Sequence, residues 1–205
     1  MKPLFVAWST TDPYYSGHAR RLKKSLDLFG LANWIVFKKS PGSWADCCFH
    51  KAHFILEALE TWDRDIVYID ADGEVMQYPE LLESIETNLA LVENAEGRGI
   101  ASMIYFRNSE RSRTFVREWI GRNEMFPNNP EADQENFGYL ARAASNLTTI
   151  LPASYNFEIG ITKLIHEPIV IRQHIASKLG IVPSFQSCHE LLQTRLRESN
   201  VDYIQ

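Results

Sequence analysis

Short apolar runs recur along the chain, separated by polar and turn-forming residues. Because they are brief and mostly lack polar alternation, they are typical of strands buried on both faces of a sheet. They lie at residues 4–8, 35–37, 66–69, 89–92 and 100–106. We predict a strand for each run and one more short strand at residues 169–171, which ends near His174.

The intervals between these runs show a helical pattern, with apolar residues three or four positions apart. Three helices are predicted from the groups Ala19, Leu22, Leu26 and Phe29; Ala52, Ile55, Leu56 and Leu59; and Phe115, Val116, Trp119 and Ile120. A fourth is expected to begin near Asp133, and a surface helix is expected at residues 190–197. Alternating strands and helices predict an α/β fold with a mostly parallel, mixed central sheet flanked by helices.

Length, charge and cysteine content limit the number of domains, the class of partner and the expected location. The chain has 205 residues, which suits one domain, and a net charge of −5, which gives no general basic field for nucleic acid. No apolar stretch approaches the roughly 20 residues of a membrane span, so none is expected. The cysteines Cys47, Cys48 and Cys188 fit neither a disulfide framework nor a metal spacing, and a reducing cytoplasm is the expected location.

The run at residues 66–69 leads directly into three acids, Asp70, Asp72 and Glu74. Ligands of open α/β sheets bind beyond the carboxyl ends of the strands, and two carboxylates spaced by one residue there can face one hard cation. The pattern alone also suits an ordinary turn, since Asp-Gly is a common turn pair. Lys51, which can reach a phosphate, and His174, which can supply a nitrogen ligand, favour the metal interpretation.

These residues stand in an order that resembles the nucleotide-diphospho-sugar transferases, glycosyltransferases of the GT-A fold. The resemblance covers roughly residues 4–178 and leaves 179–205 as an expected helical extension of a single domain at residues 1–205. It rests on Pro13-Tyr14-Tyr15, Ser43-Trp44, Lys51, residues 66–72 with the DxD acids, Tyr78-Pro79, residues 100–108, Asp133-Gln134, Tyr155-Asn156 and residues 168–174.

The resemblance implies three groups of site residues. A Mn²⁺ or Mg²⁺ ion is expected on Asp70, Asp72 and His174. A nucleotide-diphosphate sugar, most commonly a UDP-sugar, is expected to contact Ser9, Thr10, Tyr15, Lys51, Asp70, Ala71, Ala101 and Ser102. The catalytic segment is expected at Asp133, Gln134 and Glu135. In an inverting enzyme Asp133 or Glu135 would take the acceptor's proton, whereas in a retaining one Asp133 and Gln134 would hold or shield the sugar.

Several alternatives remain beside this interpretation. Asp133 can equally cap a helix, and His50 and His53 near the paired cysteines invite a zinc site without offering tetrahedral spacing. Haloacid-dehalogenase-like phosphatases also carry an apolar strand ending in Asp-x-Asp-Gly, although Glu74 stands where that family has Thr or Val. A non-catalytic nucleotide-sugar-binding domain is a further alternative. The acceptor is unassigned, and a glycan, protein or small molecule is favoured over nucleic acid.

Overall fold

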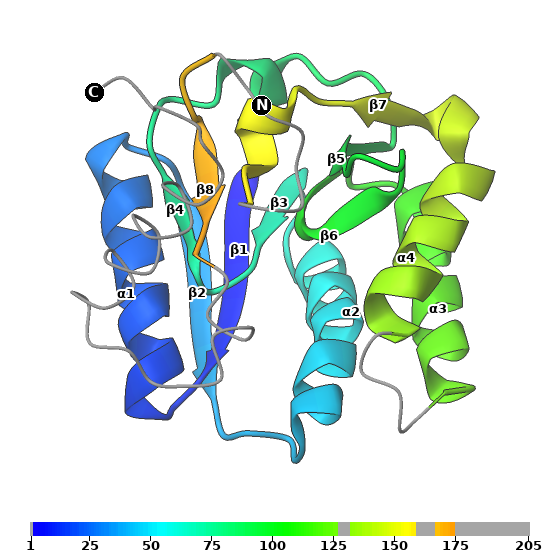
Figure 1. The fold of residues 1–205 in the computed structure, drawn as a ribbon, viewed down its shortest axis with the longest axis horizontal. Coiled ribbons are helices and arrows are strands. Elements are labelled where there is room, and N and C mark those ends of the chain that lie inside the picture. Colours follow the sequence, from blue (N-terminus) through cyan, green and yellow to red (C-terminus); the bar gives the residue numbers. More distant parts are fainter. Residues whose placement is uncertain (1, 127–131, 159–166, 175–205) are drawn as a thin grey trace, which may run out of the picture. The chain divides into compact units, whose positions relative to one another are not determined.

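The computed structural model describes residues 2–126, 132–158 and 167–174 (Figure 1). The chain divides into two units, Met1–His174 and Ile175–Gln205, and all described residues belong to the first. The helix predicted at residues 190–197 and Cys188 therefore lie outside the described residues. Among the helices that are described, none is long and apolar enough to cross a membrane.

Six strands form the central sheet, in the spatial order β2-β1-β3-β6-β5-β7. β1 pairs in parallel with β2 and β3, and β5 pairs in parallel with β7, whereas β6 is antiparallel to both β3 and β5. The bounds are β1 Leu4–Thr10, β2 Asn33–Lys38, β3 Ile66–Ile69, β5 Leu89–Glu93, β6 Gly99–Phe106 and β7 Thr148–Ile150. The predicted mostly parallel, mixed sheet is confirmed, because within this sheet only β6 reverses direction.

Helices cover both faces of the sheet (Figure 1). On one face lie α2 Trp44–Thr61, α3 Glu110–Glu124 and α4 Ala132–Ala143; on the other lies α1 Pro13–Leu28. Local capping residues fix the starts of α1 and α2. The Asp12 side chain accepts a hydrogen bond from the backbone amide of Tyr15 at the start of α1, and Ser43 and Asp46 form a reciprocal capping box at the start of α2. The described residues of this unit also include three short 3₁₀ helices, η1 Glu80–Glu83, η2 Ser145–Leu147 and η3 Ala153–Asn156.

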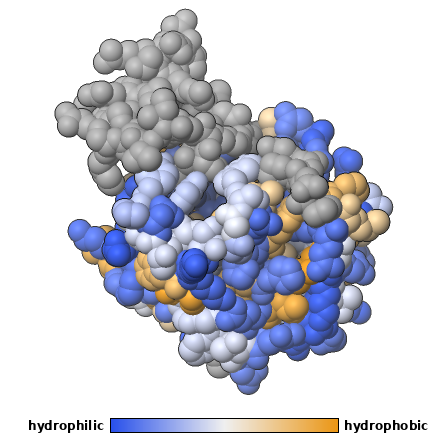
Figure 2. Space-filling model, turned by 90° about the horizontal axis from the view of Figure 1, so that it is seen from below, coloured by the Kyte–Doolittle hydropathy of each residue, from blue (hydrophilic) through white to orange (hydrophobic). Residues whose placement is uncertain are grey.

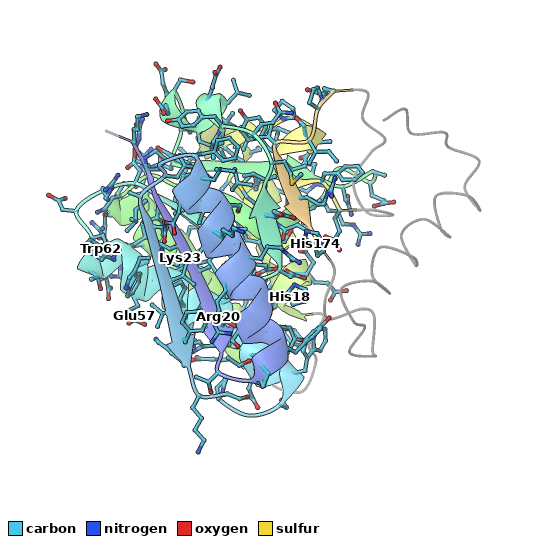
Figure 3. The ribbon with its side chains drawn as sticks, turned by 90° about the vertical axis from the view of Figure 1, so that its left-hand side faces the viewer. His18, Arg20, Lys23, Glu57, Trp62 and His174 are labelled. Carbon is cyan, nitrogen blue, oxygen red and sulfur yellow. The ribbon has the colours of Figure 1, made fainter. Side chains whose placement is uncertain are left out.

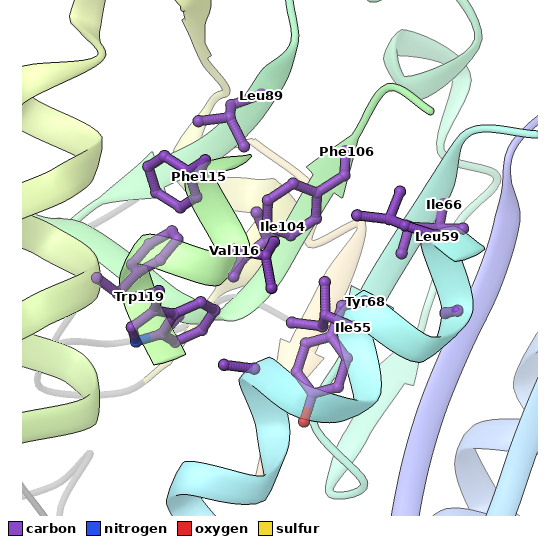
Figure 4. Close-up of a cluster of buried hydrophobic side chains, with 14 of the residues drawn as sticks. Ile55, Leu59, Ile66, Tyr68, Leu89, Ile104, Phe106, Phe115, Val116 and Trp119 are labelled. Carbon is purple, nitrogen blue, oxygen red and sulfur yellow. The ribbon is translucent and has the colours of Figure 1, made fainter. Parts of the chain in front are cut away.

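The hydrophobic core follows from the alternation of side chains along each strand. In β1, Leu4, Val6 and Trp8 face α2, while Phe5 and Ala7 face α1. Figure 4 shows the core on the α2 and α3 side, where α3 contributes Phe115, Val116 and Trp119 and β6 contributes Ile104 and Phe106. The ring of Trp119 packs against Phe137 of α4. Close packing of this kind makes the sheet a rigid support for the residues at its edge.

A second, two-stranded sheet lies on the α1 side of the molecule. It pairs β4 Gly73–Val75 with β8 Ile171–Gln173 in antiparallel register. The strand predicted at residues 169–171 is therefore real but lies two residues further along the chain. β4 was not predicted, because three residues directly after a turn carry no periodic signal. This small sheet brings residues a hundred positions apart to the same place.

Candidate functional site

The carboxyl ends of β1, β2 and β3 lie at one edge of the sheet, where α1 and α2 begin (Figure 1). Asp70 directly follows β3, and its backbone amide bonds to the carbonyl oxygen of Ser102 at 2.8 Å. Seen from this edge, the described surface is mainly hydrophilic with smaller hydrophobic areas (Figure 2). The acidic residues thus lie where ligands of open α/β sheets bind.

Lys51 joins two acids that are far apart in the sequence. Its Nζ lies 3.2 Å from Asp70 Oδ1 and 3.6 Å from Asp133 Oδ2, and it donates to the carbonyl oxygen of Ala101 at 3.2 Å. The hydroxyl of Tyr68 donates to Asp70 Oδ1 at 2.7 Å. We call Lys51, Tyr68, Asp70 and Asp133 the lysine cluster. It collects side chains from α2, β3 and α4 around one cation.

Burial shapes the charges of this cluster. Burial raises the pKa of Asp133 to about 6, against the opposing effects of Lys51 and of the hydrogen bond from Asn123. Burial also raises the pKa of Asp70, again opposed by Lys51 and reinforced by Asp72. For Lys51, burial alone would lower the pKa, but the two carboxylates outweigh it and raise that pKa above its usual range. Lys51 is therefore a permanent cation held between two acids.

The helix that carries Asp133 is fixed to the sheet by its neighbour Gln134. The Gln134 side chain donates to the carbonyl oxygen of Gly99 at 2.7 Å and accepts the amide of Ala101 at 2.9 Å. The nitrogen and the oxygen of the Gln134 side chain are thus both hydrogen-bonded to the backbone of β6. The carbonyl oxygen of Ala101 in turn accepts a hydrogen bond from Lys51. Gln134 acts here as the connection between α4 and β6.

Asp133 has its own set of hydrogen-bond partners. Its Oδ1 accepts from Asn123 at 2.9 Å, and the indole of Trp119 donates to its backbone carbonyl at 3.0 Å. Glu135, by contrast, has an exposed side chain. Among the three predicted catalytic residues, Asp133 alone is placed in the lysine cluster.

A second group of charged residues forms on the α1 side of the same edge. His174 Nε2 lies 2.7 Å from Glu74 Oε2, and Arg21 Nε lies 3.8 Å from the same oxygen. Arg21 also donates to the backbone carbonyl of Asp72 at 3.3 Å and contacts His18 Nδ1 at 2.8 Å. We call His18, Arg21, Glu74 and His174 the histidine cluster. Figure 3 shows its two histidines together on one side of α1.

Comparison with known proteins bears on the fold. No protein-family model matches the chain, and no curated protein sequence matches it. The glycosyltransferase GlyE of Streptococcus pneumoniae TIGR4 is similar, with TM-score 0.61 at 16% identity, covering 85% of this chain and 55% of GlyE. Mouse xyloside xylosyltransferase 1 is similar with TM-score 0.57 at 10% identity, covering 84% of this chain and 97% of the enzyme. The fold of this chain is the GT-A fold.

A third solved structure supports the same assignment. The galactosyltransferase LgtC, determined with donor and acceptor sugar analogues, is similar with TM-score 0.51 at 12% identity, covering 83% of this chain and 86% of LgtC. This chain spans about half the length of GlyE. At these identities the likeness establishes the GT-A fold of the described unit.

The GT-A fold places the predicted metal residues next to one another along the backbone. The amide of His174 donates to the carbonyl oxygen of Asp72 at 3.2 Å, and Asp70 precedes Asp72 by two residues. Two carboxylates and an imidazole form a donor set that suits Mn²⁺, so the chemistry of these residues fits a divalent ion. In the described part of the chain, no three His, Cys, Asp or Glu side chains are already grouped as a metal site.

At least two of the three predicted metal ligands are engaged with other side chains. Asp70 contacts Lys51 and Tyr68, and His174 contacts Glu74. Beside them, Gln173 Oε1 is a buried acceptor that has no hydrogen-bond partner among the described residues. Among the described residues, Cys47, Cys48, His50 and His53 likewise do not assemble into a zinc site.

The residues predicted for the nucleotide lie at the end of β1 and the start of α1. Ser9 is buried and donates to the carbonyl oxygen of Thr10 at 3.0 Å. Thr10 donates to Asp12, the residue that caps α1, and Tyr15 is partly buried. Burial raises the pKa of Tyr15, and nearby Tyr14 and Asp72 add to that effect. The first turn of α1, which carries Tyr15, therefore lies within electrostatic range of Asp72.

Ala71 lies within the DxD turn, and Ser102 lies in β6, where its carbonyl oxygen accepts the amide of Asp70. Ala71 is partly buried between the two acids. Ser102 is buried and exchanges hydrogen bonds with Asn156, at 3.1 and 2.9 Å. Gln173 donates to the carbonyl of Ser102 at 3.2 Å and to Asn156 Oδ1 at 2.9 Å. Ser102 thus helps to fix β8 to β6, and a sugar contact by Ser102 stays a prediction.

Sequence reasoning missed several residues of the site, among them Tyr68, Asn123 and Arg21. Tyr68 could have been found, because it lies two positions before Asp70 in a strand and so shares its face. Asn123 and Arg21 carry no comparable signal, since each reaches the site from a helix that is distant in the sequence. Their contacts with Asp133 and Glu74 emerge only when the helices pack.

Proposed function

We propose that this protein is a metal-dependent glycosyltransferase that moves a sugar from a nucleotide-diphosphate sugar to an acceptor hydroxyl. A UDP-sugar is the first donor to test. The observation that carries the proposal is the contact of Lys51 with both Asp70 and Asp133 at the carboxyl edge of a GT-A sheet. A divalent ion and one lysine together would let an acidic protein bind a diphosphate.

The leaving group sets the main chemical requirement. Glycosyl transfer passes through an oxocarbenium-like state while negative charge grows on the departing diphosphate. A divalent ion on Asp70, Asp72 and His174 would supply Lewis acidity there when bound. Lys51, which is charged at every physiological pH, supplies a fixed positive charge beside Asp70.

Asp133 is the carboxylate that we assign to the sugar-transfer step. Its pKa of about 6 makes it ionised at neutral pH yet able to accept a proton, which suits a general base in an inverting reaction. In a retaining reaction the same carboxylate would hold the sugar. Glu135 is exposed and is the weaker candidate for either role.

The test combines donor binding with turnover. UDP-, GDP-, ADP- and dTDP-sugars are screened for Mn²⁺-dependent thermal stabilisation, because a ligand that binds the folded state raises the melting temperature. The stabilising donor is then followed for release of its nucleoside diphosphate. The Asp70→Asn, Asp72→Asn double variant should lose the Mn²⁺-dependent shift. Asp133→Asn should keep the Mn²⁺-dependent shift in melting temperature, and its rate of nucleoside diphosphate release should fall about 100-fold or more. Asp63→Asn, an exposed site, is the control.

Two outcomes would favour the alternatives. If wild type binds the donor but releases nucleotide no faster than the Asp70→Asn, Asp72→Asn double variant and a protein-free control, the non-catalytic binding domain is the better description. Hydrolysis of an aryl phosphate that depends on Asp70 would favour the phosphatase, for which the GT-A fold offers no support.

The free thiols of Cys47 and Cys48 are consistent with the proposed reducing cytoplasm.

A further inference from the structure

Glu74 occupies an unusual position beside the predicted metal residues. It lies in β4, two residues after Asp72, and pairs in register with Arg172 of β8. Its carboxylate is 2.7 Å from His174 Nε2 and 3.8 Å from Arg21 Nε. The side chains of Glu74 and His174 are 26% and 23% exposed, so solvent only partly competes for this contact.

The backbone at His174 is held from two directions. Its amide donates to the carbonyl oxygen of Asp72, and the preceding Gln173 ties β8 to Ser102 and Asn156. These contacts fix the Cα of His174 but leave its imidazole free to turn about two side-chain torsions. Glu74 supplies the contact that removes this freedom.

A carboxylate bonded to one nitrogen of an imidazole has a known consequence for the other nitrogen. It orients the ring, places the proton on the bonded nitrogen and leaves the second nitrogen as a lone-pair donor. Here Nε2 faces Glu74, so Nδ1 is the nitrogen left for a cation. The 2.7 Å separation is that of a charge-assisted hydrogen bond.

We infer that Glu74 is a positioning residue that orients His174 and fixes its tautomer for divalent-ion binding. This inference rests on the proposed function, because it takes His174 as a metal ligand. Glu74 then has a role in the site without touching the ion. The competing view is that Glu74 only joins β4 to β8 and α1 through Arg172 and Arg21.

The test measures Mn²⁺ binding directly, with no donor present. Mn²⁺ is titrated into the full chain, and the free ion is quantified from its electron paramagnetic resonance signal. Glu74→Gln keeps the size of the side chain and removes its charge. We expect it to weaken Mn²⁺ binding about 10- to 100-fold. Glu83→Gln is the matched control, because Glu83 is also ion-paired, to Lys2, but lies in η1. It should stay within about twofold, since exposed distant charges are screened.

A double variant separates a positioning role from a purely structural one. If Glu74 acts through His174, adding Glu74→Gln to His174→Ala causes no further loss of Mn²⁺ affinity. A structural role would instead lower the melting temperature of Glu74→Gln without metal and leave its Mn²⁺ affinity unchanged.

The outcomes distinguish this inference from the proposed function. If His174→Ala weakens Mn²⁺ binding while Glu74→Gln does not, or if the two losses add in the double variant, the role of Glu74 is overturned and the proposed function stands. If wild type binds no Mn²⁺, or His174→Ala binds it equally well, both this inference and the assigned metal site fail.

Discussion

The lysine cluster and the histidine cluster flank the same DxD turn but are built on different principles. In the lysine cluster Lys51 is mostly buried between two acids, of which Asp70 is partly exposed, and the packing of α2, α3 and α4 excludes water from Asp133, which is 3% exposed. In the histidine cluster the side chains are partly exposed and belong to α1 and the small β4-β8 sheet. The lysine cluster is therefore part of the hydrophobic core around the central sheet, whereas the histidine cluster is supported by α1 and the two-stranded β4-β8 sheet.

This difference predicts different costs of perturbation. A buried ion pair that loses one partner leaves an uncompensated charge in a low-dielectric environment, which is costly. A partly exposed pair that loses one partner is rehydrated, which costs little. Changes to the lysine cluster should therefore affect both folding and activity, whereas changes to the histidine cluster should affect ion binding with little loss of stability.

The largest effect is expected from Lys51→Met. Removal of the cation leaves Asp70 and Asp133 facing each other without compensation, and we expect unfolding to become easier by about 3 kcal/mol, with loss of transfer activity. Urea denaturation at neutral pH measures the change. Lys23→Met is the control, because Lys23 pairs with Asp27 at 2.7 Å on the surface of α1 and should contribute under about 0.5 kcal/mol. Equal losses in the two variants would contradict the buried character of the lysine cluster.

The next largest effect is the pH dependence of folding stability that the titration of Asp133 causes. Because its pKa is about 6 in the folded protein against an ordinary 3.8, the folded state holds a proton more tightly than the unfolded state. The stability contributed by that proton is complete below about pH 4 and is lost as the pH rises to about 6. Asp133→Asn removes this titration. The stability of Asp133→Asn relative to wild type should rise by about 2 kcal/mol between pH 4 and pH 7.

Urea denaturation of wild type and Asp133→Asn at several pH values gives this difference directly. Other acids titrate in both proteins and cancel in the comparison. A difference that stays constant from pH 4 to pH 7 would mean that burial does not raise the pKa of Asp133.

The sheet and the main helices were predictable because each carries a local signal. The apolar strands at residues 66–69 and 100–106 coincide in position with β3 and most of β6, and Asp133 lies in the first turn of α4 as expected. The lysine cluster was partly predictable too. Lys51, Asp70 and Asp133 were singled out in advance, and the structure brings them together around one nitrogen atom.

The histidine cluster shows where sequence reasoning ends. The Glu74 contact depends on the antiparallel register of β4 with β8, and no short-range pattern fixes a pairing across a hundred residues. Arg21 likewise looks like one of several polar residues on α1. Gln134 illustrates the same limit, since its use as a backbone clamp on β6 follows only from how α4 packs.

Gln134→Leu tests whether the lysine cluster depends on that clamp. The change leaves the Gly99 carbonyl and the Ala101 amide without their partner, and we expect a loss of about 2 kcal/mol in unfolding free energy. Glu135→Ala, at the exposed neighbouring position, should change stability by less than about 0.5 kcal/mol. Thermal denaturation of the two variants decides the matter. If Gln134→Leu is as stable as wild type but turns over no donor, a direct role of Gln134 at the sugar is favoured over the clamp.

The smallest effect on stability is expected from Glu74→Gln in the absence of metal. Glu74 and His174 are each about a quarter exposed, so water can solvate both side chains when their contact is weakened. We therefore expect less than about 1 kcal/mol in urea denaturation with a chelator present. A loss as large as that of Lys51→Met would show that Glu74 stabilises the β4-β8 sheet itself. The contrast between the two clusters would then be wrong, because both would be structural ion pairs of similar strength.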